Sequence, residues 1–67
     1  MKARFAVQHE MDFEPTYVID TQQDVDDGGK VVAEFPPVLL PKVRLTMARR
    51  LAKELNDFAG KLFPDNA

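Results

Sequence analysis

The stretch Pro41-Lys-Val-Arg-Leu-Thr-Met-Ala-Arg-Arg-Leu-Ala-Lys-Glu-Leu-Asn-Asp-Phe-Ala-Gly-Lys-Leu-Phe63 decides the fold that we predict for this chain. Its apolar residues recur at intervals of three and four, the spacing of a helix with one buried face. They are Met47, Ala48, Leu51, Ala52, Leu55, Phe58, Ala59 and Leu62. Pro41 suits a first helical position, and Pro64 disfavours helical geometry in the residue before it. We therefore expect a helix over about residues 41–63, and its apolar stripe needs a partner surface.

Three segments before this helix have the character of strands. Apolar and polar residues alternate from Lys2 to Phe13, which predicts a half-buried strand over about residues 2–10. Residues 16–21 are β-branched and aromatic and predict a second strand. Residues 30–35 have the same character and predict a third. Turn-forming residues separate the three segments, which favours antiparallel pairing.

The predicted fold class is therefore α+β, a three-stranded antiparallel meander with one C-terminal amphipathic helix packed on one face (β-β-β-α). We expect a single domain over residues 1–67, with a Pro-rich connector at 36–41. One set of apolar side chains from the sheet would meet one set from the helix. The sheet set is Phe5, Val7, Tyr17, Ile19, Val31, Ala33 and Phe35. The helix set is Leu51, Leu55, Phe58 and Leu62.

The composition argues against most kinds of catalytic and metal site. The chain has no serine and no cysteine, so a Ser or Cys nucleophile triad, a disulfide and a thiolate metal site are all excluded. The single histidine, His9, cannot make a multi-histidine zinc site, and we interpret it as a half-buried structural residue. We expect no enzymatic activity, no catalytic residue, no metal and no cofactor.

The same features predict where the protein resides. The N-terminal residues alternate in polarity and lack the continuous apolar core of a signal peptide. No run approaches the ~20 apolar residues of a membrane span. The absence of cysteine fits a reducing compartment, so we expect a cytoplasmic protein. A chain of 67 residues is expected to be only modestly stable, and self-association would stabilise it.

Acidic residues concentrate in the expected loop between the second and third strands. Nine basic and eleven acidic residues give a net charge of −2, which does not favour general nucleic-acid binding. Asp20, Asp24, Asp26 and Asp27 nevertheless occur together without a neighbouring base. Their spacing does not match the twelve-residue pattern of an EF-hand. The loop is therefore either a solvated hairpin tip or an acidic patch that binds basic residues of a partner.

Basic residues concentrate on the helix. Arg49, Arg50 and Lys53 could contact phosphate or acidic side chains, because arginine matches both geometries. The alternative is a solvated outer face, with Arg44 inside the apolar stripe and snorkelling at the sheet margin. No aromatic residues are interleaved with the basic ones, which argues against a stacking platform for single-stranded nucleic acid.

Three segments resemble a pattern found in small uncharacterised phage and prophage proteins. They are Tyr17-Val-Ile-Asp20, Gly29-Lys-Val-Val-Ala-Glu-Phe-Pro36 and Ala48-Arg-Arg-Leu-Ala-Lys-Glu-Leu-Asn56. The likeness spans about residues 16–57, and the chain departs from the pattern in its Pro-rich connector and its acidic loop. The resemblance implies a protein that binds host machinery stoichiometrically, as anti-CRISPR inhibitors do. It carries over no catalytic residue.

The main hypothesis is a phage-type interaction protein that binds a bacterial host protein or protein complex. Asp20, Asp24, Asp26 and Asp27 would be the partner-binding residues, engaging arginines or mimicking nucleic-acid phosphates. In an alternative, Arg49, Arg50 and Lys53 bind phosphate, a nucleotide or nucleic acid. In a third, the chain is a self-associating structural module, a homodimer that pairs through an open edge of the first or third strand.

Overall fold

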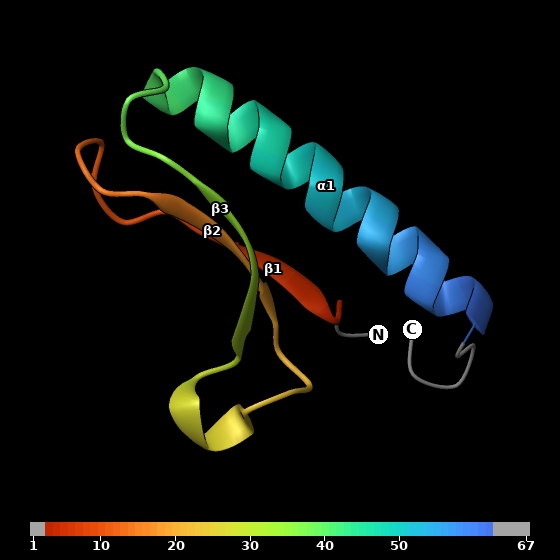
Figure 1. The fold of residues 1–67 in the computed structure, drawn as a ribbon. Coiled ribbons are helices and arrows are strands. Elements are labelled where there is room, and N and C mark those ends of the chain that lie inside the picture. The colour runs from red at the N-terminus through yellow and green to blue at the C-terminus, as the bar shows by residue number, and fades with distance from the viewer. Residues whose placement is uncertain (1–2, 63–67) are drawn as a thin grey trace.

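Three antiparallel strands and one long helix make up the fold, which confirms the predicted α+β meander. A computed structural model describes residues 3–62 of the chain. The strands are β1 (Phe5–Gln8), β2 (Thr16–Asp20) and β3 (Lys30–Phe35), in the spatial order β1-β2-β3. The helix, α1 (Pro41–Leu62), lies across one face of this sheet (Figure 1).

The element bounds differ from the expected ones mainly in β1. This strand pairs with β2 only from Phe5 to Gln8, although the alternation of polarity runs on to Phe13. The chain must reverse between the two strands, and the seven residues from 9 to 15 form that connection. Alternation alone does not show where a strand turns away from its neighbour. The expected last helical residue, Phe63, lies outside the described residues.

β2 turns toward α1 the side opposite to the one we predicted. Val18 is fully buried and packs with Ala48 and Ala52, so Thr16 and Asp20, two residues away on either side, also face the helix. Tyr17 and Ile19 lie on the outer face, and their predicted contact with the helix is wrong. The polar residues can be buried because each has a side-chain hydrogen-bond partner.

An irregularity in β3 moves Val31 to the outer face as well. Ile19 pairs with Val31 and Val18 pairs with Ala33, so Val32 is an extra residue without a partner on β2. Val31 is 50% exposed, and its predicted place against the helix is wrong. Beyond the bulge, Ala33 and Phe35 pack on the helix side of the sheet, as do Phe5 and Val7 of β1.

Alanines, more than the larger residues of the stripe, form the centre of the helix contact. Ala48, Ala52 and Ala59 are buried, whereas Leu51 and Leu55 are half-buried at the edge of the core. Phe58 is 58% exposed, so its predicted role in the core is wrong, and the side chain of Leu62 lies outside the described residues. α1 packs on β1 and β2 and makes little contact with β3.

The helix also closes one edge of the sheet through Asn56. Its Oδ1 accepts a hydrogen bond from the backbone N–H of Phe5 (2.7 Å), and its Nδ2 donates to the Phe5 carbonyl (3.0 Å). These two backbone groups point away from β2, because paired residues alternate between facing the neighbour and facing outward. The Asn56 side chain therefore stands in for a neighbouring strand. It occupies the β1 edge at Phe5, one of the two edges expected to be open for self-association.

We expect Asn56→Ala to lower the free energy of unfolding by about 1–3 kcal/mol, because two backbone groups lose their partner. Denaturant unfolding at fixed protein concentration measures this. Asp57→Ala is the matched control, since Asp57 is the exposed neighbour on the same helix and its change should have little effect. An Asn56→Ala protein as stable as the parent would contradict this role.

Candidate interaction surfaces

The β2–β3 loop presents three aspartates on an ordered turn. A single 3-10 turn (Val25–Asp27) follows Asp24, whose carbonyl accepts backbone hydrogen bonds from Asp27 (2.9 Å) and Gly29 (3.0 Å). Asp24, Asp26 and Asp27 are all exposed, and so is Val25 between them, at 67%. The loop projects from the end of the sheet, away from α1 (Figure 1). None of the ion pairs found within residues 3–62 involves these three carboxylates.

The loop returns to β3 through Gly29, a position where any other residue would be strained. Its φ of 111° lies in a region that other residues rarely adopt. A Cβ at this position would also come within 2.4 Å of Cγ2 of Ile19. The reversal of the chain into β3 is thus fixed by backbone geometry and by packing against β2.

Asp20, the fourth aspartate of the expected acidic patch, is an internal residue. Only 2% of it is exposed, and its carboxylate receives two hydrogen bonds from Arg4, Nε to Oδ1 (3.0 Å) and Nη2 to Oδ2 (2.9 Å). The backbone N–H of Gln22 donates a third, to Oδ1 (3.0 Å). Asp20 therefore closes the sheet against the N-terminal segment and is separated from the three exposed aspartates.

The Arg4 hydrogen bonds lower the pKa of the Asp20 carboxyl, and the Gln22 amide adds to this against the opposing effect of burial. A lowered pKa in the folded state means that the charged form stabilises the fold above the ordinary aspartate pKa, about 4. This contribution is lost as the pH falls through the folded-state pKa.

We therefore expect Asp20→Asn to be less stable than the parent at pH 7, with a difference that shrinks as the pH falls below about 4. Thermal unfolding from pH 7 to about pH 2 measures it. Asp24→Asn, at an exposed aspartate, should follow the parent across the range. A stability difference for Asp20→Asn that is constant with pH would argue against a stabilising Asp20 carboxylate.

The three basic residues of the alternative phosphate site lie on the exposed side of α1. Arg50 pairs with Glu54 (Nε to Oε1, 3.6 Å), and Lys53 pairs with Asp57 (Nζ to Oδ2, 3.4 Å). Both pairs are exposed and therefore weak, but each places an acid one turn from a base. Arg49, the third of these basic residues, has no carboxylate partner among the ion pairs found within residues 3–62. The surface is thus one of mixed charge.

His9 and Arg44 secure the β1–β2 connection. His9 Nδ1 lies 2.7 Å from Thr16 Oγ1, and its side chain is 14% exposed, which agrees with a half-buried structural role. Arg44 is fully buried in the first turns of α1, where we expected it to snorkel at the margin. Its Nη1 and Nη2 donate to the backbone carbonyls of Glu14 and Asp12. The Arg44 guanidinium thus joins the β1–β2 connection to the helix through main-chain acceptors. The spacing of residues along the helix does not reveal this contact.

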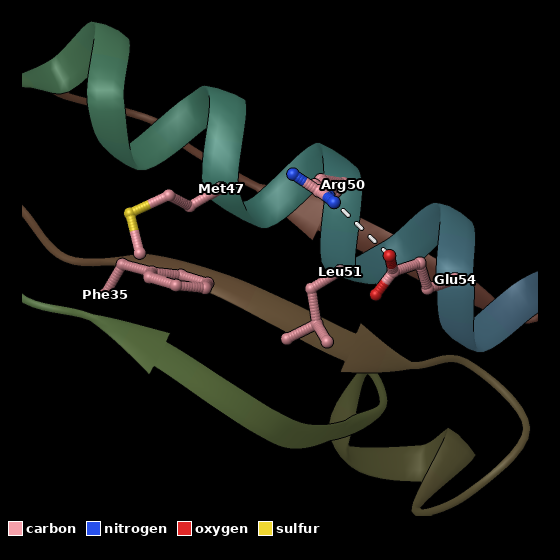
Figure 2. A pocket seen from close by; sticks show the side chains of 5 residues that line it. All are labelled: Phe35, Met47, Arg50, Leu51 and Glu54. Carbon is pink, nitrogen blue, oxygen red and sulfur yellow. Dashed lines mark ion pairs between the residues drawn. The ribbon is translucent and has the colours of Figure 1, made fainter.

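A groove between α1 and the end of β3 was not anticipated from the sequence. It has a volume of about 400 Å³ and is lined by Phe35, Met47, Arg50, Leu51 and Glu54. Figure 2 shows Met47 reaching from the helix toward Phe35 and Leu51 pointing toward the sheet, with the Arg50–Glu54 pair along the rim. A second hollow of about 250 Å³ continues along the helix and shares Met47. The sequence contains one sign of this groove, because the apolar stripe of the helix is wider than the surface that the sheet covers.

The described residues contain neither a cluster of metal-binding side chains nor a helix that could span a membrane. Between residues 3 and 62 no three His, Cys, Asp or Glu side chains gather in a way that could hold a metal ion. In the same range α1 lacks the apolar length that crossing a bilayer requires. Comparison of the chain with protein-family models, with curated proteins and with solved structures gives no match.

Proposed function

We propose that this chain is a non-enzymatic binding protein that recognises a basic surface on a bacterial host protein or protein complex. Asp24, Asp26 and Asp27 would make the contact. The observation that supports this most directly is their arrangement. Three exposed carboxylates share one hydrogen-bonded turn at the projecting end of a hairpin, and no base within residues 3–62 pairs with them.

The physical properties of this loop suit recognition. A turn that its own backbone bonds already hold in place loses little conformational freedom on binding. Clustered negative charge accelerates encounter with a basic surface and suppresses wrong partners. Val25, exposed among the aspartates, offers an apolar contact at the centre of the charged group.

The resemblance to phage and prophage proteins suggests which partners to test first. In that setting the chain would act in the cytoplasm of a bacterial host. The aspartates would mimic nucleic-acid phosphates or bind arginines on a defence complex, in the manner of an anti-CRISPR inhibitor. The basic face of α1 is a weaker candidate, because Arg50 and Lys53 each have an acid within 4 Å.

We expect the triple variant D24N/D26N/D27N to lose the partner that the parent chain captures from a bacterial lysate. Asparagine keeps the side-chain size and tolerates the positive φ of Asp24 (49°), so the loop should be retained while its charge is removed. With the partner purified, its dissociation constant should rise about tenfold or more, chiefly through slower association.

Two further variants keep this test specific. E10Q/E34Q/D57N removes the same charge from exposed residues elsewhere and should bind like the parent. R49Q/R50Q/K53Q removes the alternative basic site. Equal capture by the parent and by D24N/D26N/D27N, or loss of capture only in R49Q/R50Q/K53Q, would contradict the acidic-loop proposal.

A further inference from the structure

Large apolar side chains are scarce in the interior of this molecule, and several of them are exposed, three of these on α1. The buried apolar residues of the described chain are Val18, Ala48, Ala52 and Ala59. By contrast Val43, Met47 and Phe58 are 41%, 45% and 58% exposed. A single chain of this size buries little surface to begin with. Leaving these side chains in water forfeits stabilisation that a covering partner would recover.

The three exposed side chains lie along one line of α1, together with two opposite charges. Successive members of this line, Val43, Met47, Arg50, Glu54 and Phe58, are three or four residues apart, so they follow one side of the helix. The line borders the groove in which Met47 and Leu51 face Phe35 (Figure 2). It therefore forms an apolar strip with one base and one acid at its middle, which we call the α1 strip.

The order of residues in the α1 strip makes it complementary to itself. A two-fold axis that crosses α1 near Ala52 sets two helices side by side and antiparallel. Arg50 of each copy then faces Glu54 of the other, because both lie two residues from the axis. Met47 comes opposite the turn that carries Phe58 of the second copy. Such an isologous contact requires a surface that matches its own rotated image in charge and polarity. The α1 strip does so from Met47 to Phe58, and beyond this part Val43 comes opposite the exposed Lys61.

We propose that a second copy of this chain covers the α1 strip and the adjoining groove, so that the protein is a two-fold dimer joined through α1. A standard interface takes about 800 Å² from each partner, roughly one sixth of the 4965 Å² surface of the chain. A helix of 22 residues is about 33 Å long and can supply that contact together with β3. The interface differs from the strand-edge pairing predicted above, and it is independent of the acidic loop.

Charge reversal at the two central residues tests this geometry. In sedimentation experiments we expect the apparent mass of the parent chain to rise from 7.6 kDa toward twice that value as its concentration rises. R50E alone and E54R alone should each weaken self-association about tenfold or more, because like charges then face each other twice across the two-fold axis. An equimolar mixture of R50E and E54R should associate again, since every facing pair in the mixed dimer is of opposite sign.

Recovery of association in the mixture would show that Arg50 and Glu54 interact between copies. It cannot come from the Arg50–Glu54 pair within one helix, because neither variant retains that pair. K53E is the matched control, because Lys53 is an exposed base outside the α1 strip and its reversal should leave association unchanged. Circular dichroism checks that each variant is folded. A parent chain that stays monomeric up to about 1 mM, where only complexes weaker than millimolar would escape detection, would overturn the proposal. So would a dimer indifferent to R50E and E54R, or a mixture that fails to associate.

Discussion

The close approach of α1 to the sheet at its alanines is the constraint on which the rest of the structure depends. Ala48 and Ala52 lie against Val18, and all three are buried. Side chains this small let a helix backbone come near the strands beneath it. The larger residues on either side then cannot enter the contact, because the space is already filled. Leu51 and Leu55 pack at its border, and Met47 and Phe58 point past it.

This placement of the helix decides which surfaces are closed and which are open. Over β1 the helix is near enough for Asn56 to bond the backbone of Phe5, and its first turns bury Arg44 beneath the β1–β2 connection. Over β3 it leaves a groove. The polar residues of the interior serve the same arrangement, since Arg4 and Asp20 join the N-terminal segment to the end of β2. The acidic loop extends from the sheet end near Asp20 and takes no part in this packing.

The element order, the strand positions of β2 and β3, the helix and its start at Pro41 could all be predicted, because periodicity and proline placement report on local backbone structure. The face of β2 that packs against the helix could not be predicted. Tyr17 and Ile19 are more apolar than Thr16 and Asp20, and the choice between the two faces depends on His9 and Arg4, which are distant in sequence. For the same reason Asp20 looked like a surface acid. Val32 gives no signal of a bulge, and the roles of Arg44 and Asn56 depend on tertiary neighbours.

The free energy of unfolding of Ala48→Leu tests the central constraint most directly. If α1 approaches the sheet through its alanines, the added side chain has no space, and the variant should be destabilised by about 1–3 kcal/mol in denaturant unfolding at fixed protein concentration. Ala6→Leu, on the exposed outer face of β1, makes the same chemical change without entering the contact. An Ala48→Leu protein as stable as the parent, or more stable, would mean that the helix does not rest on its alanines.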